Sequence, residues 1–243
     1  MSRFRQTLEQ ALAVVNPGPS QWPEEAVAGI IDLLWQAYDR IYSTKLSMVN
    51  LQDADLQLER SVTVLLHDEI QSLLHERGGY ASYFVCHERW EMETLDPTSN
   101  RPPQYDLAFI WRGHPELKWP CEAKVLKNDR DIRAYTLDVR GAFIACIYAP
   151  FSGSAAMLGF LVTGDPNTVL ALLQRELAVD FNNDSVHLKR PHRHCSLPRN
   201  VPPGKSYPSP LTLHHLILEL QYPRQGAQPE SLTSKQMLLE GGS

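Results

Sequence analysis

The hydrophobic pattern of this chain changes its period at the glycine pair Gly78 and Gly79. Before the pair, apolar residues recur every three or four positions, which is the spacing of an amphipathic helix. After it, short apolar and aromatic runs are separated by turn-forming residues, which is typical of strands. The fold must therefore join a helical N-terminal part to a sheet. The predicted N-terminal helices are Arg3–Val15, Glu24–Tyr42 and Leu56–His75.

The part after the glycine pair predicts an α/β fold, with a mixed sheet flanked by helices. Two helices are expected in it, Asp129–Arg140 and Asp165–Leu177, and the second opens with an acidic cap and a proline. The predicted strands are Tyr83–Arg89, Gln104–Trp111, Leu117–Leu126, Phe143–Tyr148, Met157–Thr163 and Leu211–Leu220. We therefore divide the chain into an added N-terminal helical layer (1–60), a core (61–220) and a flexible polar tail (221–243).

Composition and short motifs exclude several classes of function. With 23 Lys and Arg against 28 Asp and Glu, the net charge of −5 argues against a polybasic protein that coats nucleic acid. No apolar stretch approaches the roughly 20 residues of a membrane span, so we expect a cytoplasmic protein without membrane contact. The four cysteines form no CxxC pair, which favours reduced core thiols. The absence of a P-loop, GxGxxG and GxSxG argues against nucleotide-driven and acyl-transfer chemistry.

Three charged residues interrupt two of the predicted strands. Asp106 stands alone in the apolar run QYDLAFIW, on the strand face of Ala108 and Ile110. Glu122 and Lys124 occupy alternate positions in CEAKV and therefore share a face, about 7 Å apart. Burying these charges is costly unless they are compensated. A hard divalent cation would compensate the carboxylates, because oxygen ligands are the ones it prefers.

An ordinary structural role is the alternative. Asp106 would then cap a strand end, and Glu122 would pair with Lys124 in an exposed contact worth under about 1 kcal/mol. The order of the residues favours a metal site instead: an acid, then Glu-x-Lys on an apolar strand, then a helix.

This arrangement resembles the PD-(D/E)xK nuclease superfamily, whose members have the restriction-endonuclease-like fold. Asp106 matches the first acid of the motif, Glu122 the second and Lys124 the lysine, and the resemblance covers roughly residues 68–163. Tyr105 stands where the motif has proline. The resemblance implies that the core, residues 61–220, is a nuclease domain.

The resemblance also implies a role for each residue of the motif. Asp106, Glu122 and the backbone carbonyl of Ala123 would hold one or two Mg²⁺ or Mn²⁺ ions, which activate water and polarise the scissile phosphate. Lys124 would orient the water and stabilise charge on the phosphate. Family members often add an acid from the preceding helix, and Glu69 is chosen here over Asp68 because it shares a helical face with leucines.

Basic residues outside the motif are candidates for binding the phosphate backbone. Arg133 and Arg140 lie on the helix after the motif, and the segment 185–210 is basic and broken by prolines. Both regions could equally be solvated surface. The candidates in the segment are Lys189, Arg190, Arg193 and Arg199.

The same segment is rich in histidine and raises a second metal hypothesis. A zinc ion could be bound by His192, His194 and Cys195 together with His214 or His215. The spacing fits no regular zinc motif, and two adjacent residues of a strand face opposite ways. We therefore expect these histidines to face nucleic acid or the core.

The sequence thus predicts a Mg²⁺-dependent nuclease that cuts DNA. Control by a sensing partner protein, as in the effector of a bacterial defence system, is expected by analogy alone. The alternatives are an RNase or exonuclease with the same site, and a nuclease-like scaffold that binds nucleic acid or a protein without cutting. Dimerisation through the N-terminal helices is a further hypothesis.

Overall fold

The computed structural model describes residues 22–78, 81–94, 102–184 and 186–221. The predicted helix Arg3–Val15 and almost all of the predicted tail lie outside these residues. The α-helices are α2 (Glu24–Arg40), α3 (Asp55–Glu76), α4 (Asp129–Asp138) and α5 (Pro166–Leu177), and the shorter helical segments are η1 (Ile41–Lys45), η2 (Leu46–Met48) and η3 (Val139–Ile144). The strands are β1 (Tyr83–Trp90), β2 (Gln104–Trp111), β3 (His114–Leu126), β4 (Ser154–Leu161), β5 (Asn182–Asn183), β6 (His192–Leu197) and β7 (Leu211–Glu219).

The strands form one mixed, open sheet of seven strands in the order β1-β2-β3-β4-β7-β6-β5. The pairs β3–β4 and β4–β7 are parallel, and the other four pairs are antiparallel. α4 lies in the connection between β3 and β4, and α5 lies between β4 and the later strands, as parallel crossovers require. The chain is therefore an α/β protein.

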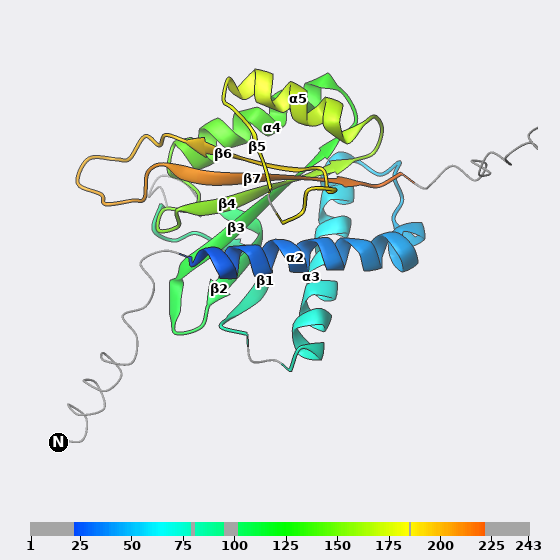
Figure 1. Ribbon diagram of the computed structural model, residues 1–243, viewed down its shortest axis with the longest axis horizontal. Helices are drawn as coiled ribbons and strands as arrows, with labels where there is room; N and C mark the ends of the chain where they lie inside the picture. The colour runs from blue at the N-terminus through cyan, green and yellow to red at the C-terminus, as the bar shows by residue number, and fades with distance from the viewer. Residues whose placement is uncertain (1–21, 79–80, 95–101, 185, 222–243) are drawn as a thin grey trace, which may run out of the picture.

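Helices cover both faces of the sheet (Figure 1). α2 and α3 pack against each other and enclose the larger core on one face, which contains Trp119, Leu158 and Leu216 from the central strands. α4 and α5 enclose a second core on the other face around Met157 and Ile217. Both faces of β4 and β7 are thus buried, which explains their nearly continuous apolar sequences.

Local sequence explains where α4 and α5 begin. The Asn128 side chain accepts from backbone amides of the first turn of α4, and Asp131 reaches back to form a capping box. Asp165 caps α5 by accepting from the Thr168 amide, and Pro166 follows at the first helical position.

The element predictions hold for the long periodic segments and fail in two places. The predicted strand Phe143–Tyr148 is wrong: α4 continues into the π-helical turns of η3, and Phe143 packs in the second core. An apolar run of six residues has no period that separates a strand from a buried helical turn. Within the basic segment 185–210, the sequence predicted no strand, but β6 pairs there with β7.

Two backbone features bear on the site. Pro120 lies inside β3, where β3 pairs with β2 only, because β4 joins from Cys121 onward. A missing amide is tolerated at such an edge. In β1, Glu88 has a φ of 51°. The residues on either side of Glu88 pair with the residues on either side of Asp106.

Candidate metal centre

The three charged residues of the predicted motif come together on β2 and β3. Leu107 pairs with Cys121 in the antiparallel ladder, which brings Asp106 opposite Glu122. Asp106 Oδ2 accepts from the Ala123 amide at 2.7 Å. Cys121, Ala123 and Val125 belong to the core under α2 and α3, so strand alternation turns Glu122 and Lys124 to the opposite face, as predicted.

Lys124 lies among three carboxylates from three different elements. Its Nζ is 3.4 Å from Glu122 Oε1, 3.6 Å from Glu59 Oε1 on α3 and 3.2 Å from Asp138 Oδ2 on α4. Together with Asp106, four carboxylates share one lysine. When all are ionised, the group carries a charge of about −3, which is costly beside a core unless a cation joins it.

One carboxylate oxygen in this group has no partner. Glu122 Oε2 is buried and has no hydrogen-bond partner among the described residues. A buried acceptor of this kind costs about 1 to 3 kcal/mol, and more when charged. The Ala123 amide points to the β2 side of β3, and its carbonyl points the same way, as in any strand residue. The unpaired oxygen, Asp106 and that carbonyl therefore supply the donor set that a hard divalent ion prefers.

Burial and mutual repulsion raise the pKa values of the carboxyl groups. Burial, with Asp106 as the next cause, raises the pKa of Glu122 well above its usual value. Burial also raises the pKa of Asp106, although the Ala123 amide and Lys124 oppose this. Burial alone would lower the pKa of Lys124, but Glu122, Glu59 and Asp138 raise it above its ordinary value. Lys124 is therefore a cation at neutral pH.

Glu59 gives a pH dependence that can be measured in the metal-free protein. Burial raises its pKa from 4.5 to about 7, against the effect of Lys124, with Asp106 and Asp138 adding to the rise. The folded state thus binds this proton more tightly than the unfolded chain does. In EDTA, the free energy of unfolding should fall as the pH rises from about 4.5 to about 7. Urea unfolding across this pH range should show a smaller decrease in the free energy of unfolding for Glu59→Gln than for the wild-type protein.

The control for this experiment is Glu25→Gln, which changes an exposed carboxylate on α2. It should leave the pH profile of the wild-type protein unchanged. Equal slopes for Glu59→Gln and wild type would contradict a carboxyl group at Glu59 that is protonated by burial.

The structure corrects the predicted helix acid. Glu69 is buried, as its position among leucines suggested, but its carboxylate contacts Lys45 at 2.5 Å and Arg40 at 3.8 Å. It lies ten residues beyond Glu59 on α3, or about 15 Å along the helix. Glu69 therefore ties α3 to the end of α2, and Glu59 is the α3 acid that lies beside Lys124.

Sequence reasoning missed both Glu59 and Asp138. Glu59 lies on the buried stripe of α3 beside Leu58 and Val62, so a charge on an apolar face was its signal. Asp138 is the last residue of α4, and no basic residue is present in the last turn of this helix. A charge on an apolar face is locally unfavourable, which is common for residues kept for function.

The structure corrects one of the predicted nucleic-acid contacts and places two others in contacts within the fold. Arg199 is buried, and its guanidinium donates to backbone carbonyls around the η3–β4 connection, so it cannot contact nucleic acid. Arg190 pairs with Asp39 of α2 and stacks over Trp35. Arg140 donates to the carbonyl of Glu176. Arg190 and Arg140 keep part of their surface exposed, so both stay predictions.

The remaining basic candidates lie away from the carboxylates. Arg133 is exposed on α4 and lines a shallow hollow with α5. Arg193 donates to the neighbouring His192 carbonyl, and Lys189 is exposed just before β6. β6 is three strand spacings from β3, about 14 Å across the sheet. The structure therefore does not bring the basic segment to the predicted motif.

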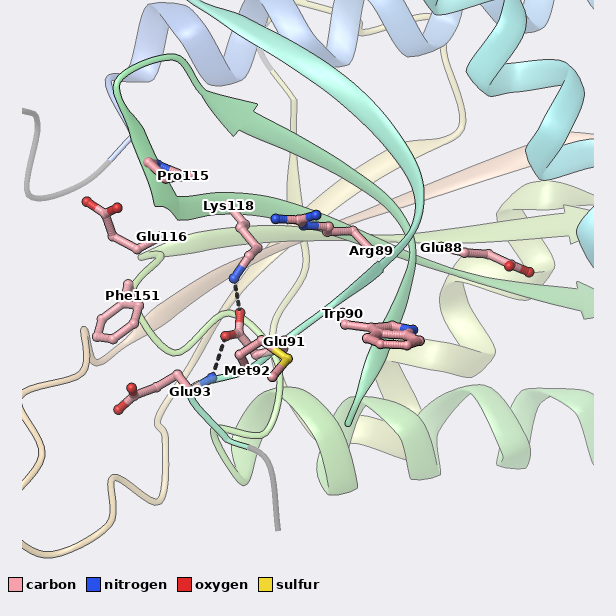
Figure 2. A pocket seen from close by; sticks show the side chains of 10 residues that line it. All are labelled: Glu88, Arg89, Trp90, Glu91, Met92, Glu93, Pro115, Glu116, Lys118 and Phe151. Carbon is pink, nitrogen blue, oxygen red and sulfur yellow. Dashed lines mark hydrogen bonds and ion pairs between the residues drawn. The ribbon is translucent and has the colours of Figure 1, made fainter. Parts of the chain in front are cut away.

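A polar cavity of about 490 Å³ lies at the end of β1 (Figure 2). In its wall, buried Lys118 contacts Glu91 at 2.9 Å, and Glu91 also accepts from the Tyr105 hydroxyl at 2.8 Å. The charges of Lys118 and Glu91 are thus paired with each other, and this contact ties the end of β1 to β3. Arg89 and Trp90 line the same cavity and are exposed.

The sheet divides the residues of the zinc hypothesis. His192 Nε2 is 3.1 Å from His214 Nδ1 on the face covered by α2, whereas Cys195 lies in the core under α4 and α5. There its thiol is 3.4 Å from His215 Nε2. A single ion cannot contact both groups, so that ligand set is wrong.

Comparisons of the chain with protein families, curated proteins and solved structures find no match. Within the described part of the chain, no helix is both long enough and apolar enough to cross a membrane. All four cysteines are free thiols. The site and the α/β fold therefore carry the functional argument.

Proposed function

We propose that this protein is a Mg²⁺-dependent nuclease of restriction-endonuclease-like fold that hydrolyses phosphodiester bonds of DNA, with Mn²⁺ as an alternative ion. The observation that carries the proposal is the unpaired, buried Oε2 of Glu122 beside Asp106, in a group with a large excess of carboxylates. The order of elements supports it. Two antiparallel strands carry the acids and the lysine, and a helix then leads to a parallel strand.

Each residue of the site has a distinct task under this proposal. Asp106, Glu122 and the Ala123 carbonyl would hold the ion, and Glu59 lies close enough to Lys124 to complete the carboxylate group. The ion would supply Lewis acidity and a water of lowered pKa. Lys124 Nζ, on a side chain that is 23% exposed, can donate both to that water and to a phosphate oxygen. Asp138 is more exposed and orients the ammonium.

Cations on α3 and β1 replace the basic segment as candidates for substrate contact. Arg60 follows Glu59 on α3, is 56% exposed and lies 3.6 Å from Glu88. Arg89 and the exposed ring of Trp90 are on the same edge strand as Glu88. A guanidinium can contact a phosphate, and a free indole can stack on an unpaired base. These residues favour approach of the substrate along β1.

The direct test is incubation of the purified chain with supercoiled plasmid, linear duplex DNA and RNA, each with Mg²⁺, Mn²⁺ or EDTA. Cleavage of DNA with either ion and its loss in EDTA is the expected result. Asp106→Asn, purified in the same way, should be inactive, which excludes a contaminating nuclease. Absence of cleavage of every substrate with both ions would overturn the proposal.

Two other functions use the same site and are separated by the same assay. Cleavage of RNA alone would make the protein an RNase. Binding without cleavage would favour a scaffold. The three carboxylate contacts of Lys124 are consistent with a scaffold, because they partly balance the charge of the site without a metal ion. Metal-dependent cleavage distinguishes the enzyme from that scaffold.

A further inference from the structure

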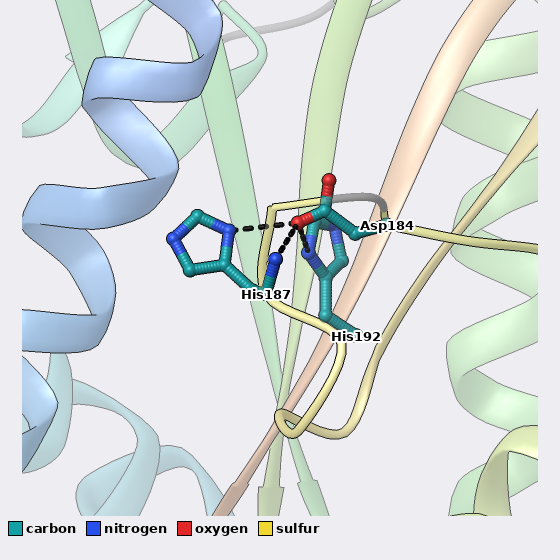
Figure 3. A group of neighbouring side chains, drawn as sticks. All are labelled: Asp184, His187 and His192. Atoms are coloured by element: carbon teal, nitrogen blue, oxygen red, sulfur yellow. Dashed lines mark hydrogen bonds and ion pairs between the residues drawn. The ribbon is translucent and has the colours of Figure 1, made fainter.

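A second group of potential ligands lies at the β5–β6 end of the sheet, three strands away from the carboxylates of β3. Asp184 and His187 belong to the connection between β5 and β6, and His192 is the first residue of β6 (Figure 3). One ligand atom from each of the three side chains lies within 4.8 Å of the other two. The group faces α2, where His187 Nε2 is 3.9 Å from Asp32.

Among the described residues, one ring nitrogen of His192 in this group has no hydrogen bond. The residue is 1% exposed, and its Nδ1 is buried without a hydrogen bond among the described residues. That nitrogen points at Asp184 Oδ2 from 3.4 Å (Figure 3). The other ring nitrogen, Nε2, contacts His214 Nδ1 at 3.1 Å. His214 therefore fixes the His192 ring through Nε2, and Nδ1 is directed at the Asp184 carboxylate.

We propose that Asp184, His187 and His192 bind one transition-metal cation of the zinc type, through a carboxylate oxygen and one ring nitrogen of each histidine. Two imidazoles and one carboxylate are a donor set suited to Zn²⁺, whereas Mg²⁺ prefers oxygen ligands. Three protein ligands leave one position for water. The site is independent of the carboxylate group on β2 and β3 and of the proposed nuclease activity.

The surroundings of the group have the parts that metal sites usually have. His214 contacts the ring nitrogen of His192 that faces away from Asp184, as outer partners of ligating histidines do. A cavity of about 700 Å³ is lined in part by Asp184, His194 and His214, so the Asp184 side of the group borders open space.

A structural turn is the competing explanation, and it accounts for only part of the group. Asp184 Oδ2 accepts from the His187 amide at 2.8 Å and contacts His187 Nδ1 at 2.7 Å, as in a turn stabilised by aspartate. This turn leaves Nδ1 of His192 buried without a hydrogen bond among the described residues. A bound cation would use that nitrogen and would fasten the loop before β6 to the edge of the sheet.

The test is a metal titration of the full chain carrying Asp106→Asn, which disables the carboxylate site. After treatment with EDTA and buffer exchange, Zn²⁺ is added in a calorimeter, and Co²⁺ is added separately while its visible absorption is recorded. We expect one equivalent of Zn²⁺ to bind, the melting temperature to rise, and Co²⁺ to give the absorption of a low-coordinate site with nitrogen ligands. His187→Ala should weaken binding by at least about 100-fold, since it removes a ligand.

Further variants decide between outcomes. His187 is half-buried and not in a strand, so its variant should fold; should it not, Asp184→Asn replaces it. His114→Ala is the matched control, because this histidine is on the β2–β3 hairpin and should leave affinity unchanged. The proposal is overturned if no Zn²⁺ binds below millimolar concentration. It is equally overturned if His187→Ala and Asp184→Asn both bind Zn²⁺ as tightly as the parent.

Discussion

Replacing Lys124 by alanine should lower the rate of metal-dependent DNA cleavage by at least about 100-fold, the size of effect seen when one preorganised charge is removed from a transition state. Among the described residues, Lys124 is the cation that contacts Glu59, Glu122 and Asp138, so we expect no neighbouring ammonium to take over its role. The measurement is the initial rate of plasmid cleavage at saturating Mn²⁺. A variant that cuts at the wild-type rate would remove Lys124 from the mechanism.

The control for this prediction is Lys127→Ala. Lys127 lies just beyond the end of β3 and pairs with Asp55 near the start of α3, outside the carboxylate group. Its removal should leave the rate within about twofold, as expected of a surface ion pair. Without Lys124, the remaining carboxylates repel one another, so Mn²⁺ should raise the melting temperature of Lys124→Ala at least as much as that of wild type. That rise shows that the ion still binds.

Arg199→Ala should be the most destabilising of the arginine substitutions. The buried guanidinium donates to five backbone carbonyls, those of Phe143, Tyr148, Ala149, Ser152 and Pro208. Removing it leaves several of these acceptors buried and unpaired, at a cost of about 4 kcal/mol. That is a large share of the roughly 5 to 15 kcal/mol that stabilises a typical domain. Urea unfolding measures the loss.

Two comparisons make this prediction specific. Arg199→Lys retains the charge but cannot reach five carbonyls with one ammonium, so it should recover less than half of the loss. Arg133→Ala removes an exposed arginine of α4 and should change stability by less than about 0.5 kcal/mol. Equal stability of Arg199→Ala and Arg133→Ala would show that the carbonyl contacts contribute nothing.

The charged residues of β2 and β3 were predictable because strand alternation is a local rule. Asp106, Glu122 and Lys124 break the apolar pattern of their own strands, and the strand ladder then brings them together. The choice between Glu59 and Glu69 was not local. Both lie on the buried stripe of α3, and only the position of that helix along β3 decides which of them meets Lys124.

The basic segment shows a different limit of sequence reasoning. A cluster of arginines without acids suggests a surface for phosphate, and an exposed loop was the simplest structure for it. Four of the five carbonyls that Arg199 contacts are 47 to 56 residues away in the chain, and the carboxylate that Arg190 contacts is 151 residues away. Composition within a window cannot reveal such distant partners. Asp184 and His187 are only three residues apart, but the contact of Asp184 with His192 depends on how the chain turns before β6.

The backbone of Glu88 has a consequence for how copies of this protein behave at high concentration. Among the described strands, β1 is at one end of the sheet and pairs only with β2, so its outer side offers free amides and carbonyls. A flat edge of this kind invites the strands of other molecules and leads to aggregation. The left-handed conformation at Glu88 interrupts that edge, and the exposed charges of Glu88 and Arg89 flank the interruption. We therefore expect Glu88 to hinder edge-to-edge pairing of β1 between copies of the chain.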